Sequence, residues 1–142
     1  MKKLVLFIGV LLSSFLAGCG NDSRHDLNVL APVSAPITIL GKSIKGTITS
    51  GDGGFASSGR STFVASSTDN TYKVIGDGIH TINSKGTFSY NASNKKATLA
   101  FDDSILGKGN YHFTFTSKTT GTYMADSEQN SKAKQTGSFE IF

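Results

Sequence analysis

Apolar and polar residues alternate with a period of two along most of the chain from about residue 37 to its end. In the segment 110–117, Tyr111, Phe113 and Phe115 occupy alternate positions, and polar residues stand between them. Successive side chains of a β-strand point to opposite faces of a sheet, so this alternation indicates strands with one buried face. No stretch of this region has the 3.6-residue period of an amphipathic helix. The pattern therefore predicts an all-β domain.

The alternating runs define eight or nine short strands, separated by segments rich in glycine, asparagine and serine, which favour turns. The predicted strands are 37–48, 60–66, 71–76, 78–82, 86–91, 96–101, 110–117, 119–125 and 134–142. Short strands and short turns indicate an antiparallel meander, whose last strand we expect to pair with an early one. We predict a small antiparallel up-and-down barrel, because closure removes exposed strand edges, with a β-sandwich as the alternative.

One face of these strands supplies the predicted core. Its members are Phe63, Tyr72, Phe88, Tyr90, Leu99, Phe101, Tyr111, Phe113, Phe115, Tyr123, Phe139 and Ile141. So many aromatic rings tend to fill a barrel of this size. This composition favours an interaction surface over an internal pocket.

The N-terminal segment has the three-part layout of a secretory signal. Lys2 and Lys3 are followed by an uncharged apolar run over 4–12 and then by small residues. A membrane-spanning helix needs about 20 apolar residues, and the segment 4–18 is shorter than that. We therefore expect this segment to be removed rather than to remain as an anchor.

The signal ends in Leu16-Ala17-Gly18-Cys19, which resembles the lipobox of bacterial lipoproteins. The resemblance implies cleavage of residues 1–18, a diacylglycerol on the Cys19 sulfur and a fatty acid such as palmitate on the new amino group. Each buried CH₂ contributes about 0.8 kcal/mol, so two or three acyl chains hold a protein on a membrane. Gly20 stands where enteric-type lipoproteins carry an inner-membrane retention aspartate, so the resemblance implies the outer membrane, at its periplasmic face or at the cell surface.

The mature chain divides into a lipidated tether over 19–35 and an antiparallel β domain over 36–142. Cys19 is the only cysteine, so no disulfide supports the domain. The segment 86–141 also resembles a β-hairpin module of bacterial secreted and lipid-anchored proteins, through the Gly-Thr-aromatic patterns at 86–88 and 121–123 and the aromatic-x-Phe-Thr-Phe pattern at 111–115. That resemblance implies consecutive β-hairpins and no particular activity.

Charge and motifs restrict the function. The formal net charge of +4 includes Lys2 and Lys3, so the mature chain is nearly neutral and lacks the basic face of a nucleic-acid-binding protein. No G-x-S-x-G motif occurs, and the three histidines lack the spacing of metal ligands. We therefore expect no enzymatic activity, no metal and no cofactor. Asp102 and Asp103 are predicted to begin a solvated loop.

Two residues are candidates for contact with a partner or ligand. Phe55 is an apolar ring in the glycine-rich segment 51–59, which we expect to be a flexible loop. His112 alternates with aromatic residues and therefore faces away from the core. The sequence thus predicts a lipid-anchored, non-enzymatic binding or interaction module of the cell envelope, with an envelope protein as partner. A lipocalin-like carrier of a small ligand is the alternative, and an envelope hydrolase is the third.

Overall fold

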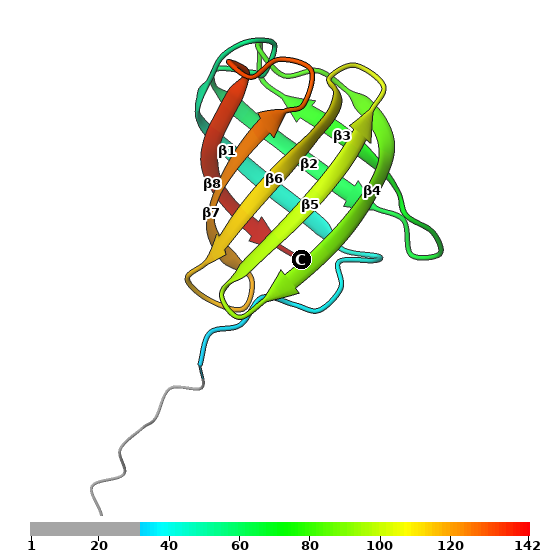
Figure 1. Cartoon of the computed structure of the whole chain (residues 1–142), viewed down its shortest axis with the longest axis vertical. Coiled ribbons are helices and arrows are strands. Elements are labelled where there is room, and N and C mark those ends of the chain that lie inside the picture. The colour runs from blue at the N-terminus through cyan, green and yellow to red at the C-terminus, as the bar shows by residue number, and fades with distance from the viewer. Residues whose placement is uncertain (1–31) are drawn as a thin grey trace, which may run out of the picture. The chain divides into compact units, whose positions relative to one another are not determined.

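The computed structural model describes residues 32–142, so the predicted signal peptide, Cys19 and most of the predicted tether lie outside the described residues. Eight antiparallel strands form a closed barrel in which every strand pairs with its neighbours in sequence and β8 pairs with β1 (Figure 1). The strands are β1 (Ser43–Gly51), β2 (Gly59–Ala65), β3 (Thr71–Asp77), β4 (Ser84–Ser93), β5 (Lys96–Asp103), β6 (Gly107–Phe115), β7 (Thr120–Ser127) and β8 (Lys134–Ile141). The predicted up-and-down barrel is confirmed, with eight strands rather than nine. Between residues 32 and 142 no helix is long and apolar enough to cross a membrane.

The segment 78–82, predicted as a strand, is a loop between β3 and β4. Gly78 has a φ of +137°, which turns the backbone out of the sheet. The backbone N–H of Gly76 donates to the side chain of Asn83 at 2.9 Å instead of to a strand. The β3–β4 ladder therefore runs only from the Thr71–Thr87 pair to the Val74–Ser84 pair.

The N-terminal segment 33–42 crosses one end of the barrel, which we call the sealed end (Figure 1, bottom, cyan). Ile39 is 1% exposed and belongs to the core, together with Ala35, while Val33 packs against it. The backbone N–H of Ala35 donates to the carbonyl of Asn94 in the β4–β5 turn at 2.6 Å. Packing against the barrel thus begins a few residues before the predicted domain boundary at 36, and β1 begins at Ser43 rather than at 37.

All twelve predicted core residues lie inside the barrel or pack against its core. Aromatic rings fill the half nearer the sealed end, where the ring of Phe139 meets those of Phe113 and Phe115 edge to face, each at 4.9 Å. Such pairs contribute about 0.5–1.5 kcal/mol beyond the area that they bury. The aromatic cluster therefore makes this half a solid core.

Small residues occupy many of the inward positions in the other half. Examples are Gly46 on β1, Ser61 on β2 and Gly137 on β8. A Cβ at Gly137 would collide with the backbone carbonyl of Thr47 and would lie 2.7 Å from the ring of Tyr123. Glycine is therefore required there for the close approach of β8 to β1, and these small residues leave the interior less filled than at the sealed end.

Candidate functional site

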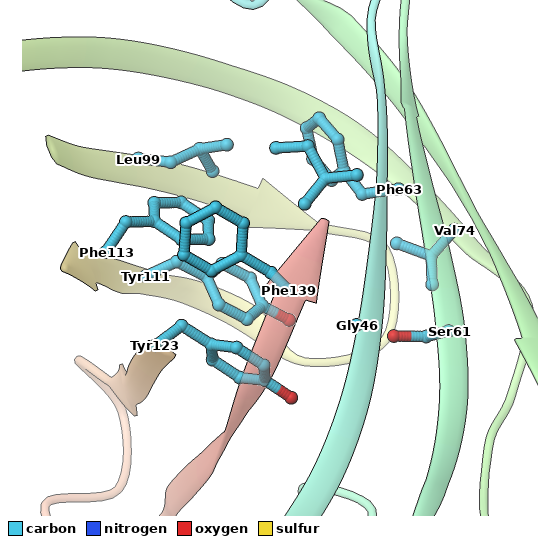
Figure 2. A pocket seen from close by; sticks show the side chains of 10 residues that line it. Gly46, Ser61, Phe63, Val74, Leu99, Tyr111, Phe113, Tyr123 and Phe139 are labelled. Atoms are coloured by element: carbon cyan, nitrogen blue, oxygen red, sulfur yellow. The ribbon is translucent and has the colours of Figure 1, made fainter. Parts of the chain in front are cut away.

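Two adjoining cavities occupy the less filled half of the barrel. The inner cavity, of about 40 Å³, lies at the centre of the barrel and is walled mainly by apolar side chains (Figure 2). Its lining residues are Ile44, Gly46, Ser61, Phe63, Val74, Leu99, Tyr111, Phe113, Tyr123 and Phe139. The outer cavity, of about 70 Å³, lies between the inner cavity and the loops that follow β1, β3 and β5. Ser61, Val74 and Tyr111 line both cavities, so the two spaces meet at these side chains.

The loops around the outer cavity form what we call the mouth of the barrel, comprising residues 52–58, 78–83, 104–106 and 128–133. Phe55, His80 and Ile82 reach the outer cavity from two of these loops. The mouth lies at the opposite end of the strands from the sealed end, because alternate turns of an up-and-down barrel lie at opposite ends. The two ends therefore differ: one is closed by the chain's own N-terminal segment, and the other carries the cavity.

A buried carboxylate organises one side of the mouth. Asp103 is 6% exposed, and its Oδ2 accepts hydrogen bonds from the Tyr72 hydroxyl at 2.6 Å and the Ser84 hydroxyl at 2.7 Å. Its Oδ1 accepts from the backbone N–H groups of Ile105 and Leu106, at 2.8 and 3.0 Å. Burial alone would raise the pKa of Asp103, but these four hydrogen bonds together outweigh it and lower the pKa. The carboxylate is thus ionised, fully bonded and structural, and the prediction that it lies in a solvated loop is wrong.

A second buried chain of hydrogen bonds lies on the opposite side. The Tyr123 hydroxyl donates to Gln135 Oε1 at 3.0 Å, and Gln135 Nε2 donates to the backbone carbonyl of Ala56 at 2.9 Å. This chain ties β7 and β8 to the loop after β1. Since the Tyr123 proton is already donated, its oxygen can act towards the inner cavity only as an acceptor.

Two hydroxyls that face the inner cavity have no such partner. Figure 2 shows the hydroxyl oxygens of Tyr111, Tyr123 and Ser61 directed into one space. Among the hydrogen bonds of residues 32–142, none involves the side chain of Tyr111 or of Ser61. Burial raises the pKa of Tyr111, and the nearby Asp103 charge raises it further, so this phenol stays protonated and can donate.

Phe55 lies inside the barrel, in contrast to the expected flexible loop. Its side chain is 7% exposed and belongs to the core, and its backbone N–H donates to the carbonyl of Asp52 at 3.3 Å in a tight turn. Phe55 is therefore not available to a partner on the outer surface, but it does line the outer cavity. Its ring can therefore contact a ligand only inside the barrel.

His112 lies on the outer face of β6, as its alternation with aromatic residues predicts. Its Nε2 is 2.8 Å from Oδ2 of Asp126 on β7, and the histidine side chain is 43% exposed. Within the described part of the chain, no serine or threonine hydroxyl bonds to this histidine. The pair lies on the outside of the barrel and lines neither cavity.

Exposed isoleucines gather around the mouth. Ile79 is 98% exposed at the tip of the loop after β3, and Ile75, Ile82 and Ile105 are each more than half exposed. No three histidine, cysteine, aspartate or glutamate side chains come together as a metal site within residues 32–142. The mouth and its cavities are the candidate site, lined by apolar side chains, hydroxyls and an amide, with His80 and the Asp103 carboxylate at the outer cavity.

Comparison of the chain with protein-family models, with curated proteins and with solved structures finds no match. The candidate site therefore rests on geometry. Ser61 and Gln135 were not singled out in the sequence, and Asp103 was assigned to a solvated loop. The alternation of the strands would have placed them inside: Ser61 stands two residues before the inward Phe63, and Asp103 two residues after the inward Phe101.

Proposed function

We propose that this protein is a lipid-anchored, non-enzymatic binding protein of the bacterial cell envelope, and that it binds through the mouth of its barrel. The difference between the two ends carries the proposal. The segment that leads towards Cys19 closes the sealed end. The opposite end carries the cavities. Exposed apolar side chains occur at both ends, but those at the mouth surround a concave site, which is typical of binding surfaces. An envelope protein is the proposed partner.

A small-ligand carrier is the second candidate function. The observation that favours it is the pair of adjoining cavities, because the core side chains leave space between the aromatic cluster at the sealed end and the mouth. Eight-stranded barrels are wide enough either to be filled by side chains or to hold one small ligand. The two candidates share the mouth as the binding end, and they differ in whether the bound molecule enters the barrel.

The anchor is tested by replacing Cys19 with serine. A hydroxyl cannot take the place of the thiolate as the acceptor of diacylglycerol, so metabolic labelling with a fatty acid should mark the wild-type protein and not Cys19→Ser. The variant should also leave the membrane fraction or keep its signal. Label that persists on Cys19→Ser would refute the proposed anchor.

The binding end is tested by photo-crosslinking in living cells. A photoreactive amino acid placed at Ile79 reports on the mouth, and the same group at Ile37 is the matched control near the sealed end, because the two side chains are 98% and 92% exposed. We expect a discrete crosslinked product from Ile79 and none of the same size from Ile37. Equal products from both positions, or none from Ile79, would contradict binding at the mouth.

A further inference from the structure

We propose that the sealed end of the barrel is a membrane-docking face, which lies on the headgroups of an anionic lipid bilayer. This inference goes beyond the binding proposed for the mouth, and it takes only the position of the lipid anchor from the proposed function. Fatty-acid labelling tests the anchor, and vesicle binding by a chain without lipid tests the docking face. A failure of one is therefore distinguishable from a failure of the other.

Three large apolar side chains are exposed at the sealed end. Ile37 and Leu40 lie on the segment that crosses this end, and they are 92% and 41% exposed. Phe142, which is 61% exposed, follows β8 and pairs through its backbone with Ser43 at the start of β1. An apolar surface gains free energy when it enters the boundary between headgroups and acyl chains, and attraction to anionic lipids adds to this gain.

Positive charge is in excess at the same end. Four exposed lysines lie in its turns or at the start of a strand there: Lys42, Lys95, Lys96 and Lys118. In the part of the chain that the structure describes, none of the four forms an ion pair with an acidic side chain. The opposing charges in these turns are Asp69 and the carboxyl group at the end of the chain, so four positive charges against two negative ones leave an excess of two.

The mouth differs from the sealed end in its charge. With histidine counted as neutral, its four loops carry Asp52, Glu128 and Lys132, which leaves one negative charge in excess. Exposed isoleucines occur at both ends and do not by themselves select a bilayer. Each lysine near an anionic lipid surface strengthens binding, so among the described residues the sealed end is the one that combines apolar contact with attraction to the headgroups.

The position of the proposed anchor favours the same orientation. Residues 20–32 separate Cys19 from Val33, which packs against the core at the sealed end. A fully extended chain of that length reaches about 50 Å at most, so the sealed end stays within that distance of the membrane. Such tethering raises the effective concentration of headgroups at this end, and a weak intrinsic affinity is then sufficient for docking. With the sealed end docked, the mouth points away from the bilayer, where a partner can reach it.

The test uses the chain from residue 20 onward, which carries no lipid and keeps every core residue, since these fall within 33–141. The chain contains no tryptophan, so Ile37→Trp introduces a single fluorescent reporter at the sealed end, and Ile79→Trp is the matched control at the mouth. We expect equimolar phosphatidylglycerol and phosphatidylcholine vesicles to shift the emission of Ile37→Trp to the blue and to leave that of Ile79→Trp unchanged. Vesicles of phosphatidylcholine alone should produce a much smaller shift.

Removal of lysines measures the contribution of charge. In the Ile37→Trp background, Lys95→Gln and Lys118→Gln should each weaken binding to the anionic vesicles about 5-fold, as expected for the loss of one lysine at such a surface. Lys132→Gln, at the mouth, is the matched control. It should change the affinity by less than about 2-fold, because the length of the barrel separates it from the bilayer by more than a Debye length.

Three results would overturn the proposal. An unchanged emission of Ile37→Trp with anionic vesicles means that the sealed end does not meet lipid. An equal blue shift for Ile79→Trp means that the contact is not specific to this end. Equal affinities with and without Lys95 and Lys118 mean that the lysines do not recognise the headgroups.

Discussion

Adjacent residues of a strand in this barrel have opposite surroundings, since one face of every strand is inside and the other is in solvent. Phe113 is 6% exposed and packs against the rings of Phe115 and Phe139. Thr114, the next residue of β6, is exposed. The alternation of β6 in the sequence predicted this register, and the structure confirms it. Substitutions at neighbouring positions should therefore differ sharply in their effect.

Replacing Phe113 with alanine should lower the free energy of unfolding by about 3–5 kcal/mol, because it leaves a large cavity in the aromatic cluster. Thr114→Ala should cost less than about 1 kcal/mol, as should His112→Ala, whose bond to Asp126 is partly exposed to solvent. Denaturation of the three variants in urea measures the difference. A large decrease in the free energy of unfolding for Thr114→Ala, together with a small decrease for Phe113→Ala, would mean that the face of β6 that carries Thr114 is the buried one.

Asp103→Asn should lower the free energy of unfolding at neutral pH by about 2–3 kcal/mol, because an amide cannot accept all four hydrogen bonds. The pKa of Asp103 is lowered in the folded chain, so its carboxylate stabilises the fold above the unfolded pKa of about 3.9, and this contribution disappears as the pH falls through the folded value. The difference in the free energy of unfolding between the wild type and Asp103→Asn should therefore become smaller below about pH 4. Urea denaturation at neutral and at acidic pH measures it, and a gap independent of pH would show that the charge contributes nothing.

The polar residues of the interior were the hardest to predict from the sequence. Alternation places Ser61 and Asp103 inside, but polar residues at strand ends usually mark the start of a solvated loop. Only the tertiary fold brings Tyr72 and Ser84 to the carboxylate from two other strands. Hydrophobic periodicity therefore identified the apolar core and missed the buried polar groups.

At the scale of whole strands, the barrel depends on glycines at inward positions as much as on its aromatic residues. Gly137 stands opposite Ile48 in the β1–β8 ladder, and its missing side chain makes room for the ring of Tyr123. β1 and β8 can therefore approach closely at the seam where the sheet closes.

Gly137→Ala should destabilise the protein by about 1–3 kcal/mol, as expected for an added methyl group in a packed interior. Ser138→Ala is the matched control at the next position, where the side chain faces solvent, and it should change stability by less than about 0.5 kcal/mol. Thermal unfolding of both variants checks the difference. If the two are equally stable, β8 can shift away from β1 without cost.

Strand positions were predictable where alternation was regular, as in β5, β6 and β8, and not where short apolar runs imitated it. The segment 78–82 was predicted as a strand, but Ile79 and Ile82 are both exposed in the loop at the mouth. The segment 37–42 contains Ile39, which is buried in a turn at the sealed end rather than in a strand. A buried apolar residue therefore does not by itself distinguish a strand of the barrel from a segment that covers its end.

For the molecule as a whole, the barrel holds all four tyrosines of the chain in or against its core. Burial raises the pKa of each, to about 12 for Tyr90 and further for Tyr72, Tyr111 and Tyr123. An unfolded tyrosine has a pKa of about 10, so the folded state loses stability as the pH rises above that value.

We therefore expect an absorbance titration to show no tyrosinate up to about pH 10 and then ionisation together with unfolding. Circular dichroism, followed in parallel, should lose the β signal over the same range. Tyrosinate that forms near pH 10 while the β signal persists would mean that at least one ring is accessible to solvent in the folded protein.

The pairing of β8 with β1 also determines when the protein can fold. Until the last strand is available, β1 and β7 are both open edges, and open edges invite pairing with other chains. Contacts between strands so distant in sequence also make folding slow. This delay suits a protein that is exported as we propose. The chain cannot complete its fold while part of it is still on the inner side of the membrane. It therefore stays unfolded, which is the state that a secretion channel can pass.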